Sequence, residues 1–111
     1  MSSDMYRALE YVDEHYRTDI TQQDVAGLLG MSTTNFSKRF TKSMGMGFAA
    51  YVMHKRIHYA IHLLQSSEKT VLEIALECGF NNTASFYKAF KKVTGLNPKE
   101  YRICKHEEVN I

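Results

Sequence analysis

DVAGLLGM at residues 24–31 is repeated as EIALECGF at residues 73–80, and this internal repeat decides the fold. At an offset of 49, Ala26 aligns with Ala75 and Gly30 with Gly79. Beyond the glycines the offset becomes 50, so the second copy contains one additional residue in its turn. The pairs at the new offset are Phe36/Phe86, Lys38/Lys88, Phe40/Phe90, Lys42/Lys92 and Gly45/Gly95.

Helical signals extend over the rest of the chain. Thr21 followed by Asp24 is the pattern of a capping box, and Gly30 fits the left-handed residue that ends a helix. No alternation of the β type occurs. We expect an all-α chain of about seven helices, at residues 4–17, Thr21 to Leu29, Ser32 or Thr33 to Met44, 48–65, 71–77, Asn81 or Asn82 to Thr94, and Asn97 onward.

Each copy of the repeat has the layout of a helix-turn-helix motif, in which a packing helix and a tight turn precede a recognition helix that reads DNA. Phe36 and Phe40 lie four residues apart, as do Phe86 and Phe90, so each pair is predicted to face the core. The opposite faces and amino ends carry groups that hydrogen-bond base edges and phosphates. The predicted DNA contacts are Thr34, Ser37, Lys38, Thr41 and Lys42 in the first copy and Asn82, Thr83, Ala84, Ser85, Tyr87, Lys88 and Lys91 in the second.

The charge distribution favours DNA binding over the alternative, solvated faces on a small helical bundle. The formal net charge is only +2, but segments 33–45 and 81–95 contain no Asp or Glu. Such patterning attracts a polyanion to one face of a nearly neutral molecule. The basic residues of the two segments are Lys38, Arg39, Lys42, Lys88, Lys91 and Lys92.

Residues 48–65 are the longest periodic stretch, and we expect one linker helix with a single apolar stripe. At ~1.5 Å per residue it spans roughly 27 Å, which makes a separation of ~34 Å between recognition helices, one turn of B-DNA, feasible. The stripe is predicted to contain Phe48, Tyr51, Val52, Ile57, Ala60, Ile61 and Leu64. The expected organisation is a first subdomain at 4–46, the linker at 47–66, a second subdomain at 67–105 and a tail at 106–111.

The composition is typical of a globular intracellular protein. Of 111 residues, 44% are hydrophobic and 23% charged, and no apolar run approaches the ~20 residues that cross a bilayer. Cys78 and Cys104 have no CxxC spacing and follow no secretory leader, which favours reduced thiols in the cytosol. We expect Cys78 to be a small core residue rather than a redox sensor.

The chain resembles the DNA-binding domain of the AraC/XylS family of bacterial transcription regulators over about residues 5–103. The most specific stretch is IALECGFNNTASFYKAFKKVTGLNPKEYR at 74–102, and RIHYAIHLL at 56–64 is similar to the family's linker-helix pattern. The motif positions that match are Ala75, Gly79–Phe80, Phe86, Phe90–Lys91–Lys92, Gly95, Pro98 and Tyr101–Arg102. The resemblance implies two tandem, homeodomain-like helix-turn-helix subdomains joined by the linker helix.

The resemblance also implies a function, namely sequence-specific binding of double-stranded DNA by a cytoplasmic regulator, with an activator favoured. Two recognition helices would enter successive major grooves, and because the two copies differ at most exposed positions the site should be asymmetric. RNA polymerase and a preceding sensing or dimerisation domain are the further partners implied. The family's base-reading positions fall on Thr34, Ser37 and Lys38 and on Thr83, Ala84, Ser85, Tyr87 and Lys88.

The sequence departs from the family pattern at four positions of the two recognition helices. Asn35 and Ser85 stand where an aromatic residue is often found. Lys38 and Lys88 stand where arginine is common. Lysine keeps the positive charge but lacks the two-pronged fork with which arginine reads guanine.

Other classes of function have less support. His54, His58 and His62 recur every four residues and could chelate zinc or copper in pairs, but no Cys, Asp or Glu nearby in sequence completes a site. We therefore expect no metal and no cofactor. No nucleophile elbow, phosphate loop or carboxylate pair supports an enzyme, and a protein-binding adaptor would leave the duplicated basic faces unexplained.

Two pairs of residues outside the recognition helices carry expectations of their own. Tyr101 and Arg102 are expected to anchor the last helix rather than to contact DNA. Lys55 and Arg56 could either meet phosphates between the half-sites or be solvated, and the sequence favours neither.

Overall fold

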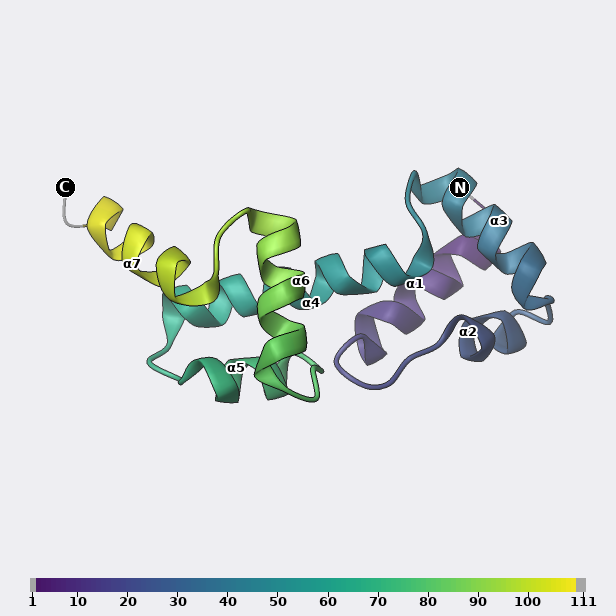
Figure 1. Cartoon of the computed structure of the whole chain (residues 1–111). Helices are drawn as coiled ribbons and strands as arrows, with labels where there is room; N and C mark the ends of the chain where they lie inside the picture. The colour runs from purple at the N-terminus through teal and green to yellow at the C-terminus, as the bar shows by residue number, and fades with distance from the viewer. Residues whose placement is uncertain (1, 110–111) are drawn as a thin grey trace. The chain divides into compact units, whose positions relative to one another are not determined.

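The computed structural model describes the backbone of residues 2–109 and the side chains of residues 2–103. This part of the chain contains helices only, which confirms the all-α prediction (Figure 1). The seven helices are α1 (Ser3–His15), α2 (Gln22–Leu28), α3 (Thr33–Met44), α4 (Phe48–Ser66), α5 (Val71–Glu77), α6 (Thr83–Thr94) and α7 (Pro98–Val109).

The helices form two compact units, and the division falls between Met53 and His54, inside α4. The first unit has a core built on the phenylalanines of α3. Phe36 and Phe40 are fully buried, and their rings meet Phe48 at the start of α4 at centroid distances of 5.8 and 5.6 Å. The remaining buried members of this cluster are Met5, Ala8, Val12, Val25, Ala26 and Val52.

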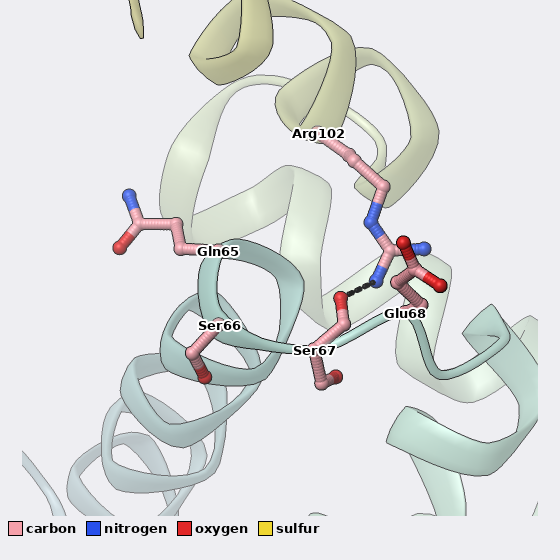
Figure 2. Close-up of a pocket in the computed structure, with 5 residues that line it drawn as sticks. All are labelled: Gln65, Ser66, Ser67, Glu68 and Arg102. Carbon is pink, nitrogen blue, oxygen red and sulfur yellow. Dashed lines mark hydrogen bonds between the residues drawn. The ribbon is translucent and has the colours of Figure 1, made fainter.

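The second unit repeats this arrangement around Phe86 and Phe90 of α6, which are also fully buried. Tyr101 of α7 meets Phe90 edge-on, with ring centroids 5.5 Å apart. Arg102 donates a hydrogen bond to the backbone oxygen of Leu64 near the end of α4, at 3.3 Å. It donates another to the oxygen of Ser67, the residue after α4, also at 3.3 Å (Figure 2). These contacts confirm that Tyr101 and Arg102 anchor the last helix.

The prediction of one apolar stripe along α4 was wrong. Phe48 and Val52 are buried in the first unit, whereas Ile57, Ala60 and Leu64 are buried in the second. At about 100° per residue, Ile57 lies roughly half a turn around the helix from Phe48 and Val52. Each end of α4 therefore buries its own set of side chains, and the second set includes Leu63, which was not expected.

Both packing helices begin with a capping box. Thr21 and Asp24 exchange hydrogen bonds as predicted, and Thr70 and Glu73 do the same at the start of α5. The second box had not been predicted, although Thr70-x-x-Glu73 carries the same sequence signal. The reciprocal hydrogen bonds satisfy backbone N–H groups that a helix start leaves without partners.

Candidate nucleic-acid interface

The two turns that precede α3 and α6 have matching backbone hydrogen bonds. Met31 N–H donates to the Ala26 oxygen over 2.9 Å, and Phe80 N–H donates to the Ala75 oxygen over 3.0 Å. The two turns differ after this hydrogen bond. Ser32, which caps α3, directly follows Met31, whereas Asn81 stands between Phe80 and Asn82, which caps α6. Asn81 is therefore the additional residue of the second copy.

The outer face of α3 contains all five residues predicted for the first copy, and none of them is buried. Ser37 is half-buried, and the other four, Thr34, Lys38, Thr41 and Lys42, are exposed. The helix carries no acidic residue, and its two phenylalanines occupy the opposite, buried face. The hydroxyl and ammonium groups of α3 thus share one accessible surface.

Arg39 also belongs to α3 but is directed into its own unit. Its Nη1 lies 3.6 Å from Oδ2 of Asp4 on α1 and donates to the sulfur of Met31 over 3.7 Å. Arg39 was counted among the basic residues of this segment, but its charge is matched by a carboxylate. Nothing in its local sequence signals this partner, which lies 35 residues earlier in the chain.

The outer face of α6 holds the residues predicted for the second copy. Thr83 and Tyr87 are half-buried, and Tyr87 meets Phe86 edge-on at a centroid distance of 6.5 Å. The exposed members are Asn82, Ala84, Ser85, Lys88 and Lys91. Like α3, the helix has no acidic residue, and Lys92 adds a further exposed ammonium group.

Asn82 has a structural role in addition to its predicted contact. Its Oδ1 accepts a hydrogen bond from the Ser85 backbone N–H at 2.8 Å, which caps α6. In α3 the same role belongs to Ser32, whose Oγ accepts from Asn35 N–H at 3.1 Å. The cap occupies one lone pair of Oδ1, and the two N–H donors of Nδ2 are not used by it.

Arg56 makes a contact that neither sequence alternative had included. Its guanidinium carbon lies 5.5 Å from the centroid of the Phe80 ring, which is a cation–π geometry. The half-buried Arg56 is therefore neither simply solvated nor turned wholly toward a phosphate. Lys55 is half-buried as well.

The other features noted in the sequence concern the cysteines, metal binding and membrane spans. Cys78 is fully buried, as expected of a core residue, while the side chains of Cys104 and His106 lie outside the described residues. Among the described residues, no three His, Cys, Asp or Glu side chains are grouped to hold a metal ion. None of the helices in that part of the chain combines the length and apolar character needed to cross a membrane.

A hollow of about 360 Å³ lies between the end of α4 and Arg102 (Figure 2). Much of its polar lining is already hydrogen-bonded within the unit. Ser66 and Ser67 donate their hydroxyls to the His62 and Leu63 oxygens at 2.7 Å, and Arg102 donates to the Ser67 oxygen. The hollow therefore belongs to the joint between α4 and α7.

A helix-turn-helix domain family matches residues 25–103, which includes both turns and both recognition helices. The chain belongs to the AraC/XylS family. An uncharacterized HTH-type transcriptional regulator of Staphylococcus aureus is 36% identical over 93 residues, 84% of this chain and 12% of the relative. The regulatory protein PocR of Salmonella typhimurium is 38% identical over 100 residues, 90% of this chain and 33% of PocR. The chain thus spans a minor part of the length of these relatives.

The fold agrees with this assignment. The C-terminal domain of AraT, a response regulator of Geobacillus stearothermophilus, superimposes with a TM-score of 0.89 at 32% identity, over 93% of this chain and 86% of that one. The AraC/XylS family is a family of transcription regulators and not a class of enzymes. Within this AraC/XylS domain, the positions that the sequence predicts to contact bases lie on or at the start of α3 and α6, and none of them is buried.

Proposed function

We propose that this chain is the part of a bacterial transcription regulator that binds double-stranded DNA in a sequence-specific way. The observation that carries the proposal is the pair of matching faces on α3 and α6. Each face is accessible and free of acidic residues, and each is held outward by two buried phenylalanines on the other side of its helix. A helix of this kind fits the major groove of B-DNA.

The residues of the two faces have distinct roles in this proposal. Hydroxyls such as those of Thr34 and Ser37 can donate to or accept from base edges, and the ring and hydroxyl of Tyr87 offer both apolar and polar contact. Lys38 and Lys88 stand at equivalent positions and can reach bases or phosphates. Thr41, Lys42 and Lys91 lie further along the helices, where phosphate contact is the expected role.

The DNA site should be asymmetric, because the two faces differ at most equivalent positions. Thr34 is matched by Ala84, and Ser37 by Tyr87. Within α3 and α6, the identical pairs outside the core are Thr33/Thr83 and the lysine pairs 38/88 and 42/92. Each helix would therefore read its own sequence in one of two successive major grooves.

The remaining parts of the proposal concern the longer protein and its setting. Because the relatives extend well beyond the matching region, a sensing or dimerisation domain and RNA polymerase are the proposed partners. The proposed action is activation in the bacterial cytoplasm. We assign the chain no catalytic activity and no cofactor of its own.

Fluorescence anisotropy with a labelled random duplex at increasing salt tests DNA binding. We expect an affinity that falls steeply with salt, since each neutralised phosphate releases about one counterion. A protein-binding adaptor would show no such dependence. Selection of bound duplexes from a random pool then tests specificity, and recovery of a palindromic consensus would contradict the asymmetric site.

A further inference from the structure

The residue that follows each turn glycine is contacted by an arginine, but the two arginines come from different helices. Met31 and Phe80 are equivalent, as their matching backbone hydrogen bonds show. The arginine against Met31 is Arg39, from the recognition helix itself. The arginine against Phe80 is Arg56, from α4.

In the first unit, a residue of the recognition helix itself makes the contacts that fix the helix in its unit. Arg39 reaches from α3 both to Asp4 of α1 and to Met31 of the turn. The second unit cannot do this, because the position equivalent to Arg39 is Ala89, which is buried. Its turn is also one residue longer, since Asn81 stands between Phe80 and the cap of α6. The connection from the packing helix to α6 is therefore one residue longer than the connection to α3.

In the second unit, aromatic contacts replace the missing arginine of the recognition helix. The centroid of the Phe80 ring lies 5.5 Å from the guanidinium carbon of Arg56 and 5.4 Å from the centroid of the Phe86 ring. Phe86 is the first core residue of α6 and precedes Tyr87, a predicted base contact. Arg56, Phe80 and Phe86 thus form a continuous chain of contacts from α4 to the start of α6.

We propose that Arg56 is a positioning residue for α6, which acts by holding Phe80 against Phe86 rather than by binding a phosphate. This inference rests on the proposed function, since it concerns how the second recognition helix is presented to DNA. The positioning role predicts that replacing Arg56 reduces base discrimination only at the half of the DNA site that α6 contacts. Reading by α3, which Arg39 holds, should not change.

The test uses the duplex that the wild-type chain selects from a random pool, together with two derivatives in which one half or the other is scrambled. Lys38→Ala and Lys88→Ala assign the halves to α3 and α6. Arg56→Ala should then reduce discrimination at the α6 half by roughly threefold to tenfold, the range of a partly desolvated cation–π contact. Arg39→Ala serves as the matched control and should leave the α6 half unchanged.

Conservative variants separate positioning from a general loss of structure. Arg56→Lys keeps a cation over the ring and should retain most of the discrimination at the α6 half. Phe80→Tyr keeps the ring face and should retain it as well. Phe80→Leu removes the ring face and should resemble Arg56→Ala. The double variant Arg56→Ala/Phe80→Leu should discriminate at the α6 half as well as Phe80→Leu alone, because the two substitutions remove the same contact. Thermal melts by circular dichroism show that the compared variants are folded.

The salt dependence separates positioning from phosphate contact. Arg56→Ala should leave the slope of log K against log salt unchanged, whereas Lys91→Ala should reduce it by about one. A reduced slope for Arg56→Ala, or an equal loss at both halves, would overturn the positioning role while leaving DNA binding intact. If the wild-type chain itself selects no sequence, the proposed function fails and this inference fails with it.

Discussion

The guanidinium of Arg102 joins α7 to the end of α4 by donating from Nε to the Leu64 oxygen over 3.3 Å. A second hydrogen bond from Nη2 reaches the Ser67 oxygen (Figure 2). These carbonyls lie at a helix end, where backbone oxygens have no partner within the helix and where the helix dipole favours a cation. One side chain therefore closes the α4 terminus and fixes α7.

Replacing Arg102 by alanine should lower the free energy of unfolding of the second unit by about 1.5–3 kcal/mol, the usual contribution of a hydrogen bond that involves a charged group. Urea unfolding measures the change. Arg102→Lys keeps the charge but not the fork, so it should recover only part of the loss. A stability equal to wild type in Arg102→Ala would show that these hydrogen bonds contribute nothing.

The left-handed glycine that ends α3 gives a second prediction. Gly45 has φ +76°, and a Cβ added there would meet no atom within 4 Å, so the effect of alanine is confined to the backbone. Gly45→Ala should destabilise the chain by about 1–2 kcal/mol. Gly47 has equally open surroundings without a left-handed φ, and Gly47→Ala is the matched control, expected to be neutral or slightly stabilising. Equal effects of the two substitutions in thermal melts would contradict this explanation.

The buried phenylalanines give the largest predicted effect. Phe40 and Phe90 are fully buried, and Phe40→Ala or Phe90→Ala should each cost about 3–5 kcal/mol and unfold its unit. Circular dichroism during heating would report the loss of helix. A melt close to wild type in either variant would mean that the buried face of the recognition helix has been assigned wrongly.

The outer faces give a prediction about binding. Lys38→Ala and Tyr87→Ala should each weaken binding to the selected duplex by about 1–3 kcal/mol with little change in the fold. Tyr87→Phe is the matched control, because it keeps the ring against Phe86 and removes only the hydroxyl. Anisotropy with selected and random duplexes measures both affinities. An equal loss on random DNA would indicate phosphate contact instead of base reading.

The capping box of α5 makes the stability of the second unit depend on pH. Hydrogen bonds from the backbone N–H and hydroxyl of Thr70 lower the pKa of Glu73 in the folded chain. Because the folded pKa lies below the unfolded one, this contribution is complete above the unfolded pKa and is lost as the pH falls through the lowered value. We expect the loss in the acid range below about pH 5.

Glu73→Gln should remove this pH-dependent part of the stability, since an amide does not titrate. Thr70→Val should reduce it without changing any charge, because the hydroxyl donor is gone. Guanidinium unfolding at a series of pH values compares both variants with wild type. Parallel stability curves for wild type and Glu73→Gln would show that Glu73 does not contribute to the acid dependence.

Much of the fold followed from local sequence signals. Phe36 and Phe40, four residues apart, define the buried side of α3, and the side chains on the other side of that helix are exposed or half-buried as predicted. Thr21 with Asp24 marks the start of α2, and Gly45 and Gly95 mark the ends of α3 and α6. These features depend on residues within one or two helical turns of each other, so their spacing is enough to predict them.

The repeat and its helical periodicity thus determined by themselves that the chain is helical, duplicated and basic on two faces. Only the tertiary structure decided which cations are available on those faces, because Arg39 is matched by Asp4 and Arg56 lies over Phe80. It also decided that α4 buries two different sets of side chains, where its periodicity had suggested one stripe. The physical reason is that a side chain's partner is set by packing between segments 24 to 35 residues apart, a distance over which helical periodicity carries no information.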